Sequence, residues 1–437
     1  MEMRSAVKLK VRRHPISPSS RVRCENSGFP ARAARRHPRP YQNVALMTIV
    51  LLTTSIDTNG IDVRVLVLGR SPVAEVTVET IATHPGVQDI QMRWADPGDP
   101  SGIRTALNNV DVVVNAVDPD RSGSAVLEAA IDTGTHYLDA CDDCDYVARM
   151  LGLDSRAKAA GICAVIGMGT SPGVTNLLAS CAAGDLDSIS DIYIAWPVDA
   201  PEGNVDVDID DPLAAATRWM HQLSGTSTVV RSGRLGSEQP LRPVTLELPR
   251  GRHGTAYTAG GPEPISLFHT LAPAGDCTTL MVVAPGTAAY LDVLRRDIDR
   301  KRLTPKAAAE QLDKPTMWRT LRSLVSASRF KAPGTLPPFF AAVSGIKDGR
   351  QRLVMAGLVD NPHPAGPAPL TASLARSIGI PLGLALFQLI DAVNPRAGVH
   401  PPEVIIEPHR FFDDLDHCLN RPGYAPSLFV EHTDCCR

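Results

Sequence analysis

The sequence predicts an α/β protein, in which a doubly wound parallel sheet is followed by a second, α+β domain on a mixed sheet. The chain has 437 residues, enough for two domains, and its 43% hydrophobic and 21% charged residues are typical of a globular protein. Short apolar runs alternate with helical patterns over residues 63–180, as they do in a parallel sheet with helices on both faces. The alternation changes near residue 187, which predicts the second domain.

Short apolar runs mark the expected strands of the parallel sheet. Residues 63–69 form a β-branched run that ends in Gly69, a pattern typical of a strand buried on both faces. Pro72 and Pro85-Gly86 then bracket a helix, because proline favours the first turn and glycine the position past the last one. The same reasoning predicts further strands over 89–94, 111–116, 136–138 and 162–166, and helices over 101–108, 126–133 and 148–160.

The pattern beyond residue 187 favours a mixed or antiparallel sheet. Residues 339–344 and 352–358 are expected to form a hairpin, and Asp348-Gly349 supplies the positive φ that a tight turn needs. An apolar helix over 372–393, interrupted by Pro381, is expected to return to the first domain and pack on it. The remaining elements expected in this half are strands over 189–196, 229–234, 244–248 and 280–284 and a helix over 288–300.

Residues 1–60 are predicted to be a basic, disordered extension. Residues 1–46 carry eleven basic and two acidic side chains, five prolines and no hydrophobic periodicity. The apolar run 44–52 is too short for a membrane span and has no nearby cleavage site, so a secretory signal is the less favoured interpretation. We favour translation from Met47 and a cytoplasmic protein with no membrane partner.

Charge and cysteine content argue against several classes of function. Beyond residue 46 the chain has 33 basic and 45 acidic residues, so no nucleic-acid-binding face is expected. Nine cysteines, an odd number, do not suit a disulfide framework. Cys141 and Cys144 have the spacing of a redox or zinc pair, but neighbouring aspartates raise a thiol pKa, and the sequence has no second such pair. We therefore expect neither a metal site nor a reactive thiol.

Four loops follow predicted strands of the parallel sheet, at residues 69–72, 115–118, 139–143 and 167–176. In open α/β sheets, ligands bind beyond the carboxyl ends of the strands. The last two loops are rich in small, turn-forming and polar residues. The sequence therefore predicts a functional site at this edge of the sheet.

Several segments resemble one known family. In the first half, residues 111–116, 134–139 and 160–176 are similar to the dinucleotide-binding half of the saccharopine dehydrogenase family. The neighbourhood of Phe268, His269 and Thr270 is most similar to the lysine 6-dehydrogenase branch. The resemblance is collinear, covers roughly residues 61–415, and includes segments similar to the family's substrate domain and closing segment at 261–270, 344–350, 398–403 and 411–412.

This resemblance implies a Rossmann domain, NADP or NAD as the cofactor, and oxidation of a C–N bond in a small-molecule amino-acid substrate. It also implies a C-terminal helix that closes the first domain, and a second domain that pairs subunits into a homodimer. The implied organisation is a dinucleotide-binding domain at 61–186, a substrate and dimerisation domain at 187–366, a C-terminal helical segment at 367–423 and a tail at 424–437.

The resemblance assigns cofactor binding to the ends of the first strands. The family's fingerprint places three glycines after the first strand, whereas here Gly69 alone remains and Pro72 removes one N–H donor from the phosphate cradle. The segment from Gly69 to Asp111 is also short by about one strand and helix, and the acid expected to bind the ribose is missing with them. The candidate cofactor-binding residues are Gly69, Arg70, Ser71, Asp96, Asn115, Ala116 and Val117, with Asp96 as the substitute acid.

A base is needed for the chemistry that the family implies, because hydride removal from a carbon bearing nitrogen requires a neutral amine. His136 and Asp139 are the catalytic candidates; the alternatives are a satisfied strand histidine and a turn cap. The turn over 169–176 opens a helix and offers N–H groups to a carboxylate. The candidate substrate-binding residues are Gly169, Ser171, Pro172, Gly173, Asn176 and His269, and no metal ligand is expected.

Two functional hypotheses follow. The first is a saccharopine-dehydrogenase-like oxidoreductase that uses NAD(P) on an amino acid or amino-acid adduct of the lysine or saccharopine type. The second is a family member with a degenerate cofactor loop that has lost dehydrogenase activity and acts as a binding or assembly protein. The single glycine of the first loop and the short first half of the sheet motivate the second hypothesis.

Overall fold

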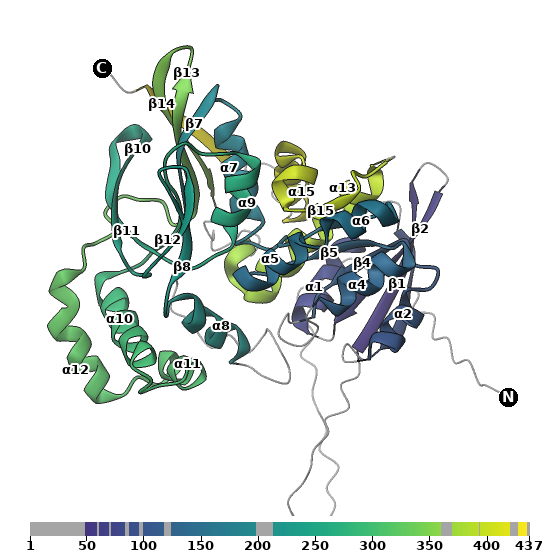
Figure 1. The fold of residues 1–437 in the computed structure, drawn as a ribbon, viewed down its shortest axis with the longest axis horizontal. Coiled ribbons are helices and arrows are strands. Elements are labelled where there is room, and N and C mark those ends of the chain that lie inside the picture. The colour runs from purple at the N-terminus through teal and green to yellow at the C-terminus, as the bar shows by residue number, and fades with distance from the viewer. Residues whose placement is uncertain are drawn as a thin grey trace, which may run out of the picture.

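The computed structural model describes residues 49–434 apart from residues 59–60, 70, 84–86, 96–98, 118–123, 198–212, 360–368, 393 and 420–426. Two sheets organise this part of the chain. Figure 1 shows the first sheet and its helices at one end of the molecule, and the second sheet with α10, α11 and α12 at the other. The predicted α/β class, with a parallel sheet and a second mixed sheet, is confirmed.

The first sheet has seven strands in the order β15-β6-β5-β4-β2-β1-β3. β2, β4, β5, β6 and β15 are parallel to one another. Alternate residues of β2 face opposite cores, with Val65 and Val67 on one side and Leu66 and Leu68 on the other, as expected for a strand covered on both faces. The strands are β1 (Ile49–Thr58), β2 (Ile61–Gly69), β3 (Val87–Ala95), β4 (Val112–Asn115), β5 (His136–Asp139), β6 (Cys163–Val165) and β15 (Gly398–His400).

β1 was not expected from the sequence. It runs antiparallel to both β2 and β3 and lies between them. The register pairs Thr58 with Ile61, so β1 and β2 form a hairpin joined by the two residues Asn59-Gly60, a strong signal for a tight turn. The predicted disordered extension over residues 1–60 is therefore wrong for residues 49–58, while residues 1–48 lie outside the described residues. β1 takes the place in the sheet that the missing strand would have held.

Helices cover both faces of the first sheet. α2, α4, α5 and α6 share one core with it, and α1, α7, α13 and α15 share the other. The second core also includes strands of the second sheet, so α7 and α13 join the two halves through one continuous apolar interior. These helices are α1 (Pro72–Ile81), α2 (Pro100–Leu107), α4 (Ala125–Thr133), α5 (Cys144–Leu151), α6 (Asp154–Ala160), α7 (Val174–Ala183), α13 (Leu374–Asp391), α14 (Pro402–Ile405) and α15 (Pro408–Cys418).

The second sheet has nine strands, seven of them in the order β10-β11-β12-β7-β13-β14-β16, while β8 pairs with β12 and β9. β12 and β7 are parallel and the other pairs are antiparallel, so the sheet is mixed. The strands are β7 (Ser188–Pro197), β8 (Ser227–Arg231), β9 (Arg234–Glu238), β10 (Pro243–Leu248), β11 (Arg252–Thr258), β12 (Cys277–Val282), β13 (Phe340–Lys347), β14 (Arg350–Leu358) and β16 (Leu428–Asp434).

β16 lies in the region that the sequence predicted to be a tail. Its residues pair with β14 at the edge of the second sheet, and Asp434 accepts a hydrogen bond from Arg352 Nε at 2.7 Å. Residues 428–434 therefore belong to the sheet. The predicted domain boundaries otherwise stay predictions. The remaining helices of this half are α8 (Ala214–Gln222), α9 (Glu263–Thr270), α10 (Pro285–Asp299), α11 (Pro305–Asp313) and α12 (Met317–Ser326), with short 3-10 turns at Pro249–Gly251, Ala327–Arg329 and Leu370–Ala372.

α13 returns to the first sheet and packs against α1, as the sequence predicts. A Cβ atom added at Gly379 would lie 2.8 Å from the Val73 carbonyl oxygen, and one at Gly383 would lie 2.6 Å from Thr80 Cγ2. The two glycines, one helical turn apart, therefore let the helices approach closely. α13 is also the one helix of the described residues that has the length and hydropathy of a membrane span, but 72% of it is buried inside the protein, where it serves as a core helix.

We expect Gly379→Ala to lower the free energy of unfolding by about 1–3 kcal/mol, because the added methyl group would overlap backbone atoms of α1. Gly286→Ala is the matched control, since a Cβ at this position in α10 has no atom within 4 Å. Urea unfolding of both variants and the wild type checks the prediction. Equal stability of Gly379→Ala and the control would contradict the close packing of α1 and α13.

Candidate functional site

The carboxyl ends of the parallel strands meet at one edge of the first sheet. Leu68 pairs with Asn115, and Asn115 pairs with Asp139, so β2, β4 and β5 end level with one another. The next strand, β6, continues into Gly167, whose N–H donates to Asp139 Oδ1 at 2.7 Å. This edge, with the loops that follow its strands, is the place where open α/β sheets bind ligands.

Gly69 ends β2 where the chain must pass close to the neighbouring strand. A Cβ atom there would lie 3.1 Å from the Ala116 carbonyl oxygen and 3.1 Å from Ala74 Cβ. The absence of a side chain therefore lets the first turn of α1 pack against the end of β4. In dinucleotide-binding folds the first glycine of this loop makes the tight turn after the strand, and the third allows close packing of helix and strand.

Ser71 is the N-cap of α1, and its buried Oγ has no hydrogen-bond partner among the residues that the structure describes. Pro72 follows at the first helical position. A helix N-terminus attracts anions through its free N–H groups and its dipole. A phosphate group would satisfy this buried hydroxyl, so the residues of this turn fit the pyrophosphate of a dinucleotide. Arg70 and Asp96 lie outside the described residues.

A chain of buried hydrogen bonds links the ends of β4 and β5. Asn115 Nδ2 donates to the Tyr137 hydroxyl at 3.1 Å, and Tyr137 donates to Asp139 Oδ2 at 2.8 Å. The Val117 N–H donates to Asn115 Oδ1 at 3.3 Å, and the Ala116 N–H donates to the Leu68 carbonyl. The polar groups of the predicted residues Asn115, Ala116 and Val117 thus shape the loop after β4.

Asp139 accepts hydrogen bonds on both carboxylate oxygens. Besides Tyr137, the N–H groups of Cys141 and Gly167 donate to its Oδ1. The side chain is buried, and this burial raises its pKa to about 6, although the hydrogen bonds oppose the shift. Asp139 therefore caps the loop after β5, as one sequence alternative suggested, and it also titrates close to neutral pH.

The turn over residues 167–176 is a compact, internally bonded structure. Gly169 N–H donates to the Pro172 carbonyl, Val174 N–H to the Gly169 carbonyl and Thr175 N–H to the Thr170 carbonyl. Gly173 has a φ of +117°, and a Cβ there would lie 2.1 Å from the Gly169 oxygen. These N–H groups, which the sequence analysis offered to a substrate carboxylate, are already occupied within the chain.

Two side chains of this turn contact a buried glutamate from the second sheet region. Ser171 Oγ donates to Glu263 Oε1, and Thr175 Oγ1 donates to the same oxygen at 3.1 Å. Thr279 of β12 donates to Glu263 Oε2 at 3.3 Å. Glu263 is fully buried at the start of α9, and this burial raises its pKa.

A second carboxylate completes the cluster. Asn176 Nδ2 donates to Glu403 Oε2 at 2.9 Å and to Ser266 Oγ at 2.9 Å, and Thr270 Oγ1 donates to Glu403 Oε1 at 2.9 Å. Burial raises the pKa of Glu403 as well. Within the described residues neither glutamate forms an ion pair, so both accept only neutral donors. A carboxyl group in such surroundings takes up a proton more readily than an exposed one.

Glu263 and Glu403 were not among the site residues predicted from the sequence. Both lie in segments that resemble the family, one after Gly261-Pro262 and the other after Pro401-Pro402. An acidic residue in an apolar, proline-rich segment was the available signal. The two glutamates accept hydrogen bonds from a turn that is about 90 residues away from Glu263 and 227 residues away from Glu403. No local sequence pattern shows such contacts.

The structure does not bring the other candidates to this edge. His136 opens β5 at the opposite, amino-terminal edge of the parallel strands, where its Nδ1 accepts from Cys163 N–H at 2.9 Å and burial lowers its pKa. His269 is exposed on α9 against the Phe268 ring. The catalytic role of His136 and the substrate-binding role of His269 therefore stay predictions, and the positions of these two side chains do not support them.

The thiols of the Cys141-Cys144 pair are held in their protonated form. Burial and the surrounding carboxylates raise the pKa of Cys144 to about 12, and burial also raises the pKa of Cys141 well above its ordinary value. The described residues contain no group of three or more histidine, cysteine, aspartate or glutamate side chains placed to hold a metal ion.

Comparison with known proteins agrees with this geometry. Residues 48–165 match the family model described as the saccharopine dehydrogenase NADP binding domain. These residues therefore form a domain of the saccharopine dehydrogenase NADP-binding type. The matched segment runs from the start of β1 to the end of β6, so it includes Gly69, Ser71 and Asp139. The predicted family and the predicted NAD(P) cofactor are confirmed, and the chain is assigned as an NAD(P)-dependent oxidoreductase.

One solved structure supports the same fold for this chain. The apo saccharopine dehydrogenase (L-Glu forming) from Saccharomyces cerevisiae is 15% identical, with a TM-score of 0.50, and the match covers 85% of this chain and 99% of that chain. A mutant meso-dapdh from Clostridium tetani E88 is 13% identical with a TM-score of 0.36, covering 79% of this chain and 94% of that chain. The first similarity shows the fold alone, and the second adds no argument.

Because the pKa of Asp139 is raised in the folded protein, the contribution of this residue to the free energy of unfolding depends on pH. The folded pKa of about 6 lies above the ordinary value of 3.8, so the folded state binds the proton more tightly, and this contribution is present at low pH and lost as pH rises from about 4 to 6. We expect Asp139→Asn to remove it. The difference in unfolding free energy between variant and wild type then shifts in favour of the variant by up to about 3 kcal/mol between acid and neutral pH. Urea unfolding at both pH values measures this shift, and a difference independent of pH would refute it.

The turn over 167–176 depends on the absence of a side chain at Gly173. We expect Gly173→Ala to lower the free energy of unfolding by about 3 kcal/mol, because the methyl group overlaps a backbone oxygen and the φ is unfavourable. Gly236→Ala on β9 is the control, since a Cβ there meets no atom within 4 Å. Chemical denaturation compares the two, and a Gly173→Ala protein as stable as the control would disprove the role of this glycine.

Proposed function

We propose that this protein is a dehydrogenase that uses NADP or NAD to oxidise or form a C–N bond in an amino acid or amino-acid adduct of the lysine or saccharopine type. The observation that carries the proposal is the unpartnered, buried hydroxyl of Ser71 at the start of α1, beside Gly69. A hydroxyl buried without a partner is costly unless a ligand satisfies it. The substrate class rests on the resemblance to the family.

The dinucleotide would lie across the carboxyl edge of the first sheet. Gly69 lets the start of α1 approach the end of β4, Ser71 would donate to the pyrophosphate, and the N-terminus of α1 would add its dipole. When bound, the nicotinamide supplies the hydride acceptor or donor. The hydrogen bond from the Val117 N–H to Asn115 holds residues 115–117 at this edge.

Asp139 is the proposed proton acceptor for the substrate amine. It lies at the same edge as Gly69 and Asn115, and its pKa of about 6 is closer to the working range of a general base than that of an exposed aspartate. Its carboxylate would release a hydrogen bond from one of its three donors to receive the substrate. Glu263 and Glu403 act on the neighbouring turn, where they position Ser171 and Asn176.

Assembly and location are further parts of the proposal. The homodimer and the small-molecule character of the substrate rest on the resemblance to the family, and the cytoplasmic location rests on the composition of the chain. A panel of amino acids tested with both cofactors, followed by nicotinamide absorbance, identifies the substrate.

A second candidate function is a family member that has lost dehydrogenase activity and acts as a binding or assembly protein. The observation that favours it is β1, which fills the sheet position next to β2 with an antiparallel strand. The carboxyl end of β1 therefore lies at the far edge of the sheet and cannot present an acid to the ribose. The two functions differ in whether the protein turns over a substrate with NAD(P).

We expect Ser71→Ala to weaken NADPH binding about tenfold, because it removes one hydrogen bond to a charged phosphate. Nicotinamide fluorescence during titration with NADPH and NADH measures the affinity. Ser101→Ala is the control, since this serine on α2 hydrogen-bonds the nearby Asp99 at the surface. We expect it to bind as the wild type does.

Three results separate the alternatives. Wild-type binding with a weakened Ser71→Ala variant supports the proposed cofactor site. Equal binding by both proteins would reject Ser71 as a phosphate ligand. No binding of either nucleotide at millimolar concentration would favour the non-enzymatic function.

A further inference from the structure

α12 has its apolar side on the outside of the protein. Five apolar side chains of this helix are between 50% and 83% exposed, and their spacing places them on one stripe. Figure 1 shows the helix at the outer edge of the molecule, beyond α10 and α11. The five residues, here called the α12 stripe, are Met317, Trp318, Leu321, Leu324 and Val325.

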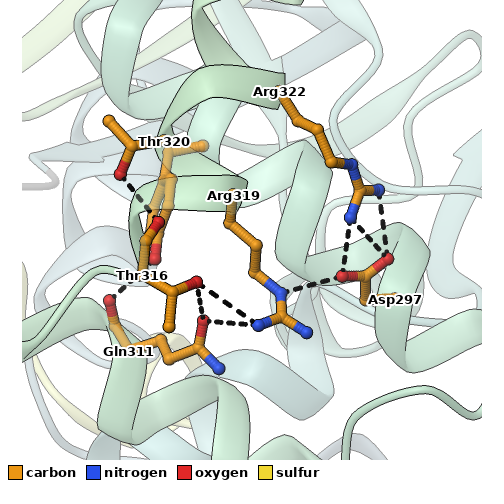
Figure 2. Close-up of polar contacts among 7 residues, drawn as sticks. Asp297, Gln311, Thr316, Arg319, Thr320 and Arg322 are labelled. Atoms are coloured by element: carbon orange, nitrogen blue, oxygen red, sulfur yellow. Dashed lines mark hydrogen bonds and ion pairs between the residues drawn. The ribbon is translucent and has the colours of Figure 1, made fainter.

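The polar side of the same helix faces the protein. Arg319 Nε donates to Asp297 Oδ2 at 2.8 Å, and Arg322 donates to both oxygens of this carboxylate at 2.9–3.1 Å (Figure 2). The Asp297 side chain is only 2% exposed. Ser323 and Ser326 are buried on the same side. Breaking a buried ion pair of this kind is costly, so the contacts with Asp297 fix the orientation that exposes the α12 stripe.

Arg319 is anchored a second time. Its Nη1 donates to Gln311 Oε1 at 3.0 Å and to Thr316 Oγ1 at 3.4 Å, which ties the start of α12 to the end of α11 (Figure 2). The helix is therefore held at its N-terminal turn and along its inner side. An outward apolar stripe on a firmly held helix is a surface for a partner, since the protein does not bury it itself.

The α12 stripe is large for a monomer surface. Its five side chains together expose on the order of 500–600 Å², which is at the upper end of the largest apolar patch on an ordinary monomer. Its aliphatic and indole groups give it no hydrogen-bonding specificity apart from the Trp318 N–H. The partner must therefore offer an apolar medium and not a set of polar contacts.

The segment of the chain that contains the α12 stripe is positively charged. Residues 300–331 contain nine basic and two acidic side chains, although the whole chain has a net charge of −3. Seven of the nine are exposed: Arg300, Lys301, Arg302, Lys306, Lys314, Arg329 and Lys331. Lys314 and Arg329 lie three residues before the first and three residues after the last residue of α12. The partner must therefore also carry negative charge.

We propose that α12 is a membrane-interface helix that binds anionic lipid bilayers, with the α12 stripe inserted at the level of the headgroups and the basic residues in contact with lipid phosphates. Interfacial helices combine an apolar side containing tryptophan and leucine with flanking lysine and arginine, and anionic headgroups attract such basic segments. This proposal goes beyond the proposed enzyme function and departs from the sequence-based expectation of no membrane partner.

Charge argues against the two other occupants. A second copy placed symmetrically on this surface would bring two segments together that each have seven more basic than acidic residues. A nucleic acid would require basic or stacking groups across the contact itself, whereas the α12 stripe is mainly aliphatic. An anionic bilayer is the partner that matches both the apolar stripe and its basic surroundings.

The test is flotation of the full-length protein with vesicles. We expect binding to mixed phosphatidylserine–phosphatidylcholine vesicles at low salt, and at least about tenfold weaker binding to pure phosphatidylcholine or at high salt. Trp318→Ser/Leu324→Ser and Lys314→Glu/Arg329→Glu should each reduce binding by at least about tenfold. Leu235→Ser is the control, because Leu235 is an exposed leucine on β9 that is outside the α12 stripe, and it should bind as the wild type does.

Each other outcome overturns the proposal. Wild-type protein that stays with the unbound fraction rejects lipid binding, and α12 variants that float as well as the wild type reject α12 as the contact. Sedimentation velocity tests whether a second copy of this chain is the partner. If the wild type is a dimer that Trp318→Ser/Leu324→Ser converts to a monomer, and neither protein floats with vesicles, the α12 stripe is a self-association surface. Binding to a single-stranded oligonucleotide in place of vesicles would assign the surface to nucleic acid. Circular dichroism of every variant confirms that it folds.

Discussion

The placement of the candidate site depends on two glutamates, the buried Glu263 and the half-buried Glu403, which form no ion pair within the described part of the chain. An unpaired carboxylate in the interior is costly, so the neutral donors around Glu263 and Glu403 must all be directed at them. These donors come from the turn after β6, from α9 and from β12, elements that are far apart in the sequence. Satisfying the two carboxyl groups therefore fixes how the second sheet meets the first.

Close backbone contacts hold α1 in a similar way. The end of β4 presses against the start of α1 at Gly69, and α13 presses against its middle at Gly379 and Gly383. α13 also reaches the turn after β6, where Thr170 donates to the Ser377 carbonyl. The helix end proposed to receive the pyrophosphate is thus located by the first and the last parts of the fold together, which suits a site that must place a cofactor accurately.

Much of the fold could be predicted from local patterns, and the failures have physical causes. Apolar periodicity predicts β2, α1, β4 and β7, because the spacing of apolar residues within each element shows which of its sides is buried. β1 was missed because residues 1–60 were assigned to a disordered extension from the composition of residues 1–46, and the Asn59-Gly60 pair was overlooked. The expected helix over 148–160 is two helices, α5 and α6, because the first ends at Gly152. The roles of Glu263 and Glu403 arise from distant contacts that a single sequence does not display.

The direction of β1 has a practical consequence for work with this protein. Because the strand is antiparallel to β2, its first residues pair with Ala95 and Gly69, at the edge where the nucleotide is proposed to bind. The chain therefore enters the first sheet at that edge, through Ile49. A truncation that removes β1 would leave β2 and β3 without the strand that lies between them, so variants made for titration should keep residues 49–58 intact.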